Sequence, residues 1–373
     1  MRILNVVGAR PNLMKIAPLV AEMSRQAGIQ QILLHTGQHY DDQMSQVFFE
    51  ELGIPRPDIY LGVGSGSHAR QTAAIMPAFE DALLEQEPDL VLVVGDVNST
   101  LACAITAAKL GVPVAHVEAG LRSNDRSMPE EINRVVTDQL SELLFTTTRE
   151  AGDHLQREGI SPEKIHFVGN VMIDTLNRHR PQAEVLQTAH KFGIDPGHYA
   201  LLTLHRPSNV DDPKVLAGIL AALLDIQGDV PILFAAHPRT RKQIRAFGLQ
   251  ERLDSAINLQ MVEPLSYLET LDLMMHARLV LTDSGGLQEE TTVLGVPCLT
   301  IRENTERPVT ISTGTNTLVG TDPDRILAEA RRILEGKGKT GGIPELWDGH
   351  ASERIVKILQ AWPAANNFGR QRN

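Results

Sequence analysis

Short apolar runs that alternate with amphipathic stretches constrain the fold of this chain more than any other feature. Continuous Val, Leu and Ile runs predict strands at residues 3–7, 31–35, 90–94, 113–117, 143–146, 199–203, 231–235, 279–282 and 297–300. A strand that is apolar at consecutive positions is buried on both faces, which is typical of parallel sheets. Amphipathic periodicity predicts helices between them, at residues 13–25, 43–52, 69–85, 100–110, 130–141, 213–225, 267–276, 287–294 and 325–334.

This alternation indicates an α/β protein with doubly wound sheets. The pattern loosens between residues 167 and 181, and a second strand–helix series begins near Tyr199. A chain of 373 residues also exceeds what one core usually supports. We therefore predict two Rossmann-like domains, residues 1–168 and 169–351, which face a cleft and bind ligands at the carboxyl ends of their strands.

Composition excludes several classes of function. The net charge of −11 argues against binding nucleic acid through its phosphates, so an anionic ligand must be met by a local group of cations. No apolar run is long enough to predict a membrane span, and the short run at the N-terminus is unlike a signal peptide. Cys103 and Cys298 lie in apolar surroundings, which suits buried free thiols in a reducing cytoplasm.

The segment from Leu279 to Glu290 predicts a phosphate site. An apolar strand runs into Ser284, Gly285 and Gly286 and then into a helix, so free backbone N–H groups and a helix N-terminus meet at one point. Glycine lets the backbone approach an anion closely, and the Glu290 carboxylate, about one helical turn further on, can reach sugar hydroxyls. Strand–glycine–helix turns also occur in α/β folds without this function, so the segment alone leaves both interpretations open.

Charged side chains also follow the strands of the first half. Arg10 and Lys15 flank the start of a helix, where they can hold a pyrophosphate or lie as ordinary surface cations. Asp96 follows its strand as a candidate acid/base group, with helix capping as the alternative. Glu118 ends the next strand, with Arg122 as a candidate partner. Carboxylates on neighbouring strand tips can divide acid and base roles.

Two acidic residues and several cations complete the set of candidates. Glu130 and Glu131 begin a helix, where one of them can simply complement the helix dipole. The second half offers candidate anion contacts after its strands, namely His205, Arg206, His237 and Arg307. A loose dinucleotide pattern at residues 64–69 lies away from the first strand, and His35 and His39 straddle a turn. We therefore expect neither a dinucleotide cofactor nor a metal.

Together these motifs resemble the non-hydrolysing UDP-N-acetylglucosamine 2-epimerases. The resemblance covers nearly the whole chain, with matching order and spacing. The motifs that carry it are Gly8-Ala-Arg-Pro11 with Lys15, Thr36-Gly-Gln-His39, Gly95-Asp96, His116-Val-Glu-Ala-Gly-Leu-Arg122, Pro129-Glu-Glu131 with Asn133-Arg134, His205-Arg206, Asp283-Ser-Gly-Gly-Leu-Gln-Glu-Glu290 and Thr305-Glu-Arg-Pro308.

The resemblance implies a reversible inversion at C2 of UDP-N-acetylglucosamine, which gives UDP-N-acetylmannosamine. Members of the family eliminate UDP, leave a bound 2-acetamidoglucal and add UDP back after protonation from the other face. The implied acid/base set is Asp96, Glu118 and Glu130, with His205 beside the departing pyrophosphate. The implied contacts to UDP are Arg10, Lys15, Arg206, His237, Ser284, Gly285, Gly286 and Arg307, with Glu290 on the ribose.

The resemblance also implies an architecture and a setting. The fold is the two-domain GT-B type of many nucleotide-sugar glycosyltransferases, with UDP in the second domain and a helix at residues 352–365 returning to the first. A cytoplasmic homodimer without a cofactor, acting in polysaccharide biosynthesis, is implied as well. In many bacterial members a second UDP-N-acetylglucosamine activates the enzyme, and Gln43, Gln46 and Arg70 lie in that region here.

Three departures from the family pattern leave the exact sugar open. Asn12, Ser208 and Val309 each stand where a glutamate is common, and all lie in substrate loops. One alternative is the same chemistry on another UDP-2-acetamido sugar, such as a diacetamido uronic acid. A retaining glycosyltransferase of the same fold, a hydrolysing epimerase and a nucleotide-sugar-binding sensor are further alternatives. The presence of both Asp96 and Glu118 favours an epimerase over the sensor, and a glycosyltransferase has no need for three acidic groups at the strand ends of the first domain.

Overall fold

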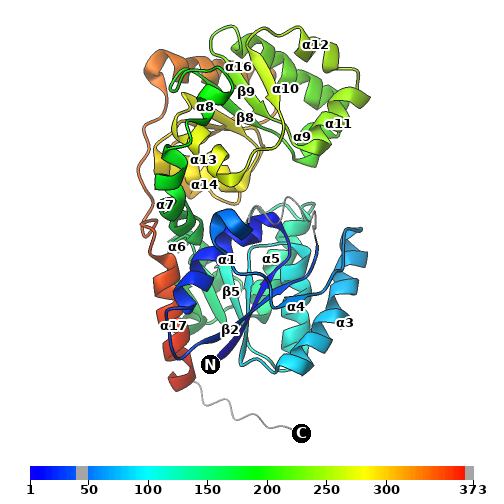
Figure 1. Cartoon of the computed structure of the whole chain (residues 1–373), viewed down its shortest axis with the longest axis vertical. Coiled ribbons are helices and arrows are strands. Elements are labelled where there is room, and N and C mark those ends of the chain that lie inside the picture. The colour runs from blue at the N-terminus through cyan, green and yellow to red at the C-terminus, as the bar shows by residue number, and fades with distance from the viewer. Residues whose placement is uncertain (39–48, 366–373) are drawn as a thin grey trace. The chain divides into compact units, whose positions relative to one another are not determined.

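A computed structural model describes residues 1–38 and 49–365 of the chain (Figure 1). The chain forms two compact units: unit 1 is Met1–Thr175 with Glu345–Asn373, and unit 2 is Leu176–Pro344. The chain passes from one to the other within helix α7 (Val171–Glu184). The sequence pattern loosens over this stretch, but the stretch is helical. Its apolar residues do not follow a single helical stripe because Asp174 and other polar groups there are buried as well.

Unit 1 is built on a seven-stranded parallel sheet. The strand order is β3-β2-β1-β4-β5-β6-β7, so the winding reverses between β1 and β4. The strands are β1 (Arg2–Val7), β2 (Gln30–His35), β3 (Ile59–Tyr60), β4 (Leu90–Val94), β5 (Val114–Ala119), β6 (Leu143–Thr146) and β7 (Ile165–Phe167). In a doubly wound sheet, the ligand site lies outside the carboxyl ends of the strands at such a reversal.

Helices cover both faces of this sheet. They are α1 (Arg10–Met23), α3 (His68–Gln86), α4 (Asn98–Lys109), α5 (Pro129–Leu140), α6 (Arg149–Arg157) and α17 (Ala351–Ala365), with a short 3₁₀ turn η1 (Pro162–Lys164). The C-terminal helix α17 packs against α1 in unit 1 (Figure 1). Asp174 anchors the start of α17 because its carboxylate accepts hydrogen bonds from the backbone N–H groups of Ala351 (3.2 Å) and Ser352 (2.7 Å).

Unit 2 repeats the design with a six-stranded parallel sheet in the order β10-β9-β8-β11-β12-β13. The strands are β8 (Ala200–Thr203), β9 (Ile232–Ala235), β10 (Leu259–Val262), β11 (Leu279–Thr282), β12 (Cys298–Thr300) and β13 (Asn316–Leu318). Its helices are α8 (Thr188–Lys191), α9 (Pro207–Val210), α10 (Pro213–Ile226), α11 (Pro238–Ala246), α12 (Gln250–Asp254), α13 (Tyr267–Met275), α14 (Gly285–Leu294), α15 (Val309–Ser312) and α16 (Pro323–Arg332), followed by η2 (Ile333–Lys337).

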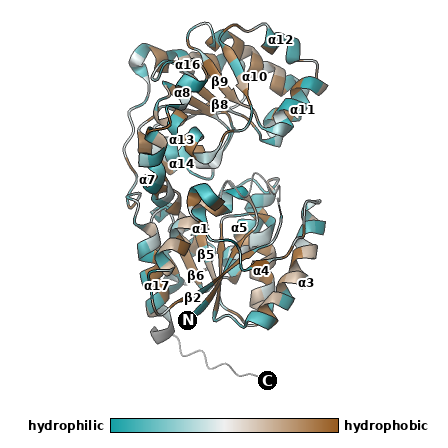
Figure 2. Cartoon of the chain, viewed as in Figure 1, coloured by the Kyte–Doolittle hydropathy of each residue, from teal (hydrophilic) through white to brown (hydrophobic). Residues whose placement is uncertain are grey.

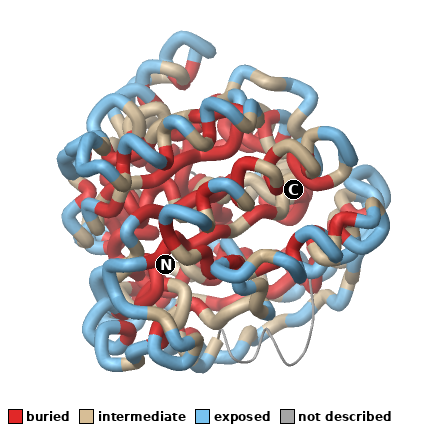
Figure 3. The backbone as a smooth tube through the Cα atoms, turned by 90° about the horizontal axis from the view of Figure 1, so that it is seen from above, coloured by how far each residue is buried: buried red, intermediate tan, exposed pale blue. Residues whose placement is uncertain are grey.

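The central strands carry the core of each unit. Every residue of β4 is buried, as is every residue of β11. Hydrophobic residues gather on the strands and on the helix faces that meet them (Figure 2), and the buried backbone lies inside a periphery of exposed loops and helix faces (Figure 3). Burial of apolar strands and helix faces is the main favourable term in folding such units. No helix among the described residues is long and apolar enough to cross a membrane.

The doubly wound α/β prediction is confirmed, and all nine predicted strands are present. The four strands that the apolar runs did not predict are β3, β7, β10 and β13, and each forms an edge of its sheet. Edge strands have a neighbour on one side only, and these four are two to four residues long and partly exposed. They therefore lack the continuous apolar run of a central strand. Of the helix predicted at residues 43–52, residues 43–48 lie outside the described part of the chain.

Candidate functional site

The carboxyl ends of β1, β4 and β5 place the charged residues of unit 1 at one edge of the sheet. Val6 of β1 pairs with Val93 of β4, and Val94 of β4 pairs with Val117 of β5. Asp96 lies two residues beyond the end of β4, and Glu118 is the second-last residue of β5, so both lie at the carboxyl ends of neighbouring strands. The short turn after β1 lies at the same edge and leads into α1, which begins at Arg10.

Glu118 projects from a β-bulge. The register of β5 against β6 shifts between Val117 and Ala119, and Glu118 has a φ of 75°, in the left-handed region. Its carboxylate is buried and forms an ion pair with Lys15 of α1. The prediction that Arg122 is its partner is wrong, because Arg122 pairs with Asp138 (2.7 Å) and Glu158 (2.6 Å) instead.

Lys15 therefore lies close to the acidic edge of the sheet. The turn after β4 makes room for Lys15 because it contains Gly95 (φ 68°), where a Cβ would lie 2.8 Å from the Lys15 Nζ. Asn12 ties the same turn together, accepting from the backbone N–H of Ala9 (3.1 Å) and donating to the carbonyl of Val94 (2.8 Å). Glutamate is common at this position in the family that the motifs resemble. The amide of Asn12 fixes the loops after β1 and β4 without adding a charge.

Asp96 is held by helix α5. Arg134 donates from Nη1 to Asp96 Oδ2 at 2.5 Å, and Asn133 donates to the Asp96 carbonyl at 2.8 Å. The alternative that Asp96 caps a helix does not hold, because α4 begins at Asn98 with Val97 at its N-cap and no side-chain capping bond. The Asp96 side chain is 23% exposed, whereas that of Arg134 is 1% exposed. The buried Arg134 guanidinium thus orients the Asp96 carboxylate, which is exposed enough to contact a ligand.

The two glutamates at the start of α5 have different environments. Glu131 is buried and accepts hydrogen bonds from the backbone N–H of Ser123 (2.9 Å), the backbone N–H of Asn124 (2.9 Å) and Arg134 Nη2 (2.6 Å). Burial opposes ionisation of Glu131, but these donors outweigh it and lower its pKa. Glu131 therefore holds Arg134 and the loop before α5 in place, and it does more than complement the helix dipole. Glu130 is half-buried in the first turn.

In unit 2 a buried carboxylate, Asp283, organises the strand ends of β8 and β11. It accepts from the backbone N–H of His205 (2.9 Å), the backbone N–H of Arg206 (2.8 Å) and Nδ2 of Asn209 (3.1 Å). Its Oδ1 lies 2.8 Å from His205 Nδ1. Burial opposes ionisation of Asp283, but His205 and the two amides outweigh it and lower its pKa. Asp283 lies in one of the motifs that carry the family resemblance, but the sequence alone indicates no role for it.

The contacts with Asp283 hold the imidazole of His205 at the surface. The His205 side chain is 42% exposed although its Nδ1 is paired with Asp283. The ring of His237 lies 6.0 Å from that of His205, centroid to centroid. His237 is the N-cap of α11 and accepts from the backbone N–H of Arg239 at 3.2 Å. The two predicted histidines thus come together after β8 and β9.

The phosphate-site prediction falls on the start of α14. Ser284 is the N-cap and makes no side-chain capping bond, and the helix begins at Gly285. A Cβ at Gly285 would lie 2.6 Å from Nη1 of Arg307 and 3.1 Å from Oε1 of Glu306. Glycine at this position therefore lets the Arg307 guanidinium reach the helix start. The sequence motif alone suggested room for the ligand, whereas the structure shows room for a cation beside it.

A buried charge network surrounds Arg307. Its guanidinium pairs with Glu306, and its Nε lies 2.8 Å from Glu289 Oε1. Arg302 pairs with Glu306 at 2.7 Å, and Arg206 lies 3.7 Å from it. Burial opposes ionisation of Glu306, but the three arginines outweigh it and hold its pKa well below the usual value. Because three guanidinium groups face two carboxylates, the network leaves positive charge for an anionic ligand.

Glu290 has a different character from the other acidic candidates. It is buried and accepts a hydrogen bond from the Tyr267 hydroxyl at 3.0 Å. Burial raises the pKa of Glu290 to about 8, and the nearby Glu289 carboxylate adds to the increase. A protonated carboxyl group can both donate hydrogen bonds to sugar hydroxyls and accept hydrogen bonds from them.

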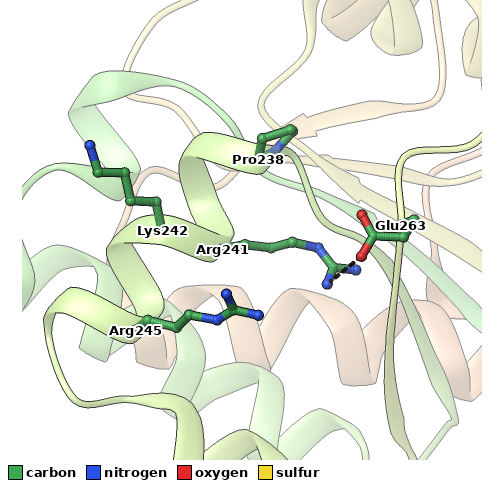
Figure 4. A pocket seen from close by; sticks show the side chains of 5 residues that line it. All are labelled: Pro238, Arg241, Lys242, Arg245 and Glu263. Atoms are coloured by element: carbon green, nitrogen blue, oxygen red, sulfur yellow. Dashed lines mark ion pairs between the residues drawn. The ribbon is translucent and has the colours of Figure 1, made fainter. Parts of the chain in front are cut away.

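A surface pocket of about 390 Å³ lies on α11, beside these candidates in the sequence. It is lined by Pro238, Arg241, Lys242, Arg245 and Glu263 (Figure 4). Arg241 points toward Glu263 and pairs with it at 2.9 Å. None of the predicted site residues lines this pocket. Among the described residues, no group of three or more His, Cys, Asp or Glu side chains is arranged to hold a metal ion.

Comparison with known proteins identifies relatives over most of the chain. Residues 21–360 match the family model described as UDP-N-acetylglucosamine 2-epimerase. A UDP-N-acetylglucosamine 2-epimerase of Methanococcus maripaludis is 43% identical, covering 95% of this chain and 97% of the relative. A UDP-2,3-diacetamido-2,3-dideoxy-D-glucuronate 2-epimerase of Pseudomonas aeruginosa is 42% identical, covering 96% of this chain and 99% of the relative.

A solved structure matches equally well. The crystal structure of Methanocaldococcus jannaschii UDP-GlcNAc 2-epimerase, in complex with UDP-GlcNAc and UDP, superposes with a TM-score of 0.90. The two sequences are 43% identical, and the match covers 96% of this chain and 99% of the other.

Proposed function

Because the chain belongs to the UDP-N-acetylglucosamine 2-epimerase family, we propose that it interconverts UDP-N-acetylglucosamine and UDP-N-acetylmannosamine by inverting C2. One observation carries this proposal beyond family membership. Asp96 lies just after β4 and Glu118 lies near the end of the neighbouring β5, and each carboxylate is paired with a buried cation, Arg134 or Lys15. Two oriented carboxylates at one edge of the sheet are what proton transfer at two faces of a sugar carbon requires.

The proposed reaction proceeds by elimination and re-addition. A carboxylate removes the C2 proton while the C1–O bond breaks, so the C1–C2 double bond of a 2-acetamidoglucal forms and UDP departs with the electron pair. A second acidic group then protonates C2 from the opposite face, and UDP adds back to C1. We assign these proton transfers to Asp96, Glu118 and Glu130. The ion pair with Lys15 holds the Glu118 carboxylate in place in the bulge.

The same proposal gives unit 2 the task of holding UDP. Negative charge grows on the pyrophosphate as the C1–O bond breaks, and preorganised donors stabilise it there. We propose His205, Arg206, Arg307 and the backbone amides of residues 284–286 for this role, with His237 and, from unit 1, Arg10 and Lys15 as further contacts. Neutral Glu290 would hydrogen-bond the ribose hydroxyls.

A second candidate substrate is a UDP-2,3-diacetamido uronic acid. The relative from Pseudomonas aeruginosa, which carries that activity in its name, is nearly as similar as the acetylglucosamine epimerases. The elimination chemistry at C2 is identical for both sugars. They differ in the carboxylate at C5 and the second acetamido group, so we propose that the segments around Asn12, Ser208 and Val309, in the first turns of α1, α9 and α15, decide between them.

Proton NMR in D₂O tests the proposal directly. The purified protein is incubated with UDP-N-acetylglucosamine and, separately, with the diacetamido uronic acid sugar. UDP-N-acetylmannosamine that carries deuterium at C2 is the expected product. Free N-acetylmannosamine and UDP would instead identify a hydrolysing enzyme. Turnover of the uronic acid sugar alone would move the assignment to that substrate, and absence of deuterium from the product would refute proton abstraction at C2.

We also propose that the enzyme is a cytoplasmic homodimer that supplies a precursor for polysaccharide synthesis. Light scattering coupled to size-exclusion chromatography measures the oligomeric state, and a monomeric mass would refute the dimer. Activation by a second substrate molecule is a further proposal. Arg70 is exposed on α3, whereas Gln43 and Gln46 lie outside the described residues. Sigmoidal dependence of the rate on UDP-N-acetylglucosamine would support this activation.

A further inference from the structure

Glu118 occupies a backbone conformation that its surroundings must enforce. Its φ of 75° lies in the left-handed region, which residues with a Cβ disfavour. Its side chain is buried, and the strand register shifts at this residue. Strained conformations of this kind persist only where neighbouring contacts over-determine them.

Asp138, on the second half of α5, supplies contacts on both sides of Glu118. Its Oδ1 lies 2.6 Å from Nδ1 of His116, two residues before Glu118. Its Oδ2 accepts from the backbone N–H of Gly120 at 3.1 Å and from Arg122 at 2.7 Å. One carboxylate therefore holds the chain at three points that bracket the bulge.

Both ring nitrogens of His116 have a partner. Nε2 of His116 lies 2.8 Å from the carbonyl oxygen of Gly95, which only accepts hydrogen bonds. Nδ1 lies 2.6 Å from Oδ1 of Asp138. Burial opposes ionisation of Asp138, but His116 and Arg122 outweigh it and lower its pKa. The carboxylate is thus charged and bonded through both oxygens.

The position of Asp138 on α5 links it to the other acidic candidates. Glu130, Arg134 and Asp138 are spaced four residues apart and lie on one face of the helix. Arg134 holds Asp96, and Glu130 is itself in the proposed acid/base set. The same face therefore contributes Glu130, contacts Asp96 through Arg134, and holds the residues on either side of Glu118 through Asp138.

We propose that Asp138 is a positioning residue, which clamps β5 on both sides of Glu118 and so keeps the Glu118 carboxylate in the bulge beside Lys15. The clamp is a property of the fold, and its consequence for turnover rests on the proposed function. The two can therefore be tested separately.

The first test needs no substrate. In the otherwise unchanged protein, Glu118→Gly should have a higher Tm than Glu118→Ala, because glycine adopts a positive φ without the steric cost that alanine meets. If Asp138 enforces that φ, the order should disappear or reverse in an Asp138→Ala background, since glycine is the less favourable residue in ordinary strand conformations. Asp138→Ser serves if Asp138→Ala does not fold.

Asp174→Ala is the matched control for this comparison. Asp174 is also a buried aspartate of unit 1 that accepts backbone hydrogen bonds, but it serves the start of α17 rather than β5. This control should lower Tm while preserving the advantage of glycine at position 118. An advantage that survives Asp138→Ala, or that Asp174→Ala also abolishes, would overturn the clamp.

The second test concerns turnover. Asp138→Ala should lower kcat by about 10²-fold, the effect of misplacing a reacting group by about 1 Å, and leave the Kd for UDP unchanged. Asp138→Asn should restore most of kcat. Its oxygen can accept from Gly120 and Arg122, and its amide can donate to Nδ1 of a neutral His116 whose Nε2–H still bonds Gly95. Equal losses in both variants would overturn the clamp, whereas absence of turnover in the unmodified protein would refute the proposed function alone.

Discussion

Arg134 bridges Asp96 and Glu131, donating to Asp96 Oδ2 at 2.5 Å and to Glu131 Oε2 at 2.6 Å while only 1% of its side chain is exposed. Glu131 in turn holds the loop before α5 through two backbone amides. The acidic edge of unit 1 is therefore a charged network, in which the buried cation orients the exposed carboxylate. Loss of one charged member of such a network lowers the stability of the protein, because the remaining charges stay buried without compensation.

Replacement of Arg134 by leucine should destabilise the protein by about 3–5 kcal/mol, since it leaves Glu131 as an uncompensated buried charge. Urea denaturation of the purified variant measures this loss. Arg25→Leu provides the comparison, because Arg25 forms an exposed pair with Glu22 and its loss should cost less than about 1 kcal/mol. Similar losses in both variants would contradict the role given to the buried network.

Removal of Asp96 or Glu118, two of the three proposed acid/base groups, should affect turnover rather than UDP binding. Asp96→Asn and Glu118→Gln preserve shape while removing the charge that accepts a proton, so kcat should fall by about 10²–10⁴-fold. The Kd for UDP, measured by isothermal titration calorimetry, should change little or tighten in Glu118→Gln, because Lys15 loses its competing carboxylate. A large loss of UDP affinity with normal turnover would reverse the assignment.

The central architecture could be predicted from the sequence because burial on both faces imposes a continuous apolar run on each central strand. The edge strands, such as β3 and β13, escape this requirement and leave no comparable signal. Helix α7 was missed for a related reason, because buried polar groups such as Asp174 interrupt its apolar stripe. What pattern reasoning detects is therefore the buried centre of each sheet.

The candidate site could likewise be predicted only in part. Placement of Asp96 and Glu118 at one edge follows from parallel strand topology, which the sequence pattern predicts. Their partners do not follow from it. Arg122 is four residues from Glu118, but the bulge leaves Glu118 paired with Lys15 of α1 instead. Contacts of this kind join residues far apart in the chain, and local spacing carries no information about them.

Gly285→Ala should weaken UDP binding. Its Cβ would lie 2.6 Å from Nη1 of Arg307, so the guanidinium must move away from the start of α14. Loss of one charge-assisted contact to a phosphate corresponds to about 1.5–3 kcal/mol, or roughly a 10- to 100-fold increase in the Kd. Calorimetric titration with UDP measures the change. Gly28→Ala, where the added Cβ meets nothing within 4 Å, should bind UDP normally, and an unaffected Gly285→Ala would exclude Arg307 from the phosphate site.

Glu290 should make the stability of the ligand-free protein fall as the pH rises. Burial raises its pKa to about 8, from an ordinary value of 4.5. The folded protein therefore keeps a proton that the unfolded chain releases, and between these two values the free energy of unfolding decreases by up to about 1.4 kcal/mol per pH unit. Glu290→Gln is neutral at every pH and lacks this contribution. Urea denaturation at about pH 6 and about pH 8 measures the free energy of unfolding of both proteins. The free energy of unfolding of Glu290→Gln, relative to that of the parent, should increase between these two pH values. A constant difference over that interval would mean that Glu290 is ionised in the folded state, in which case it would meet the ribose as an acceptor only.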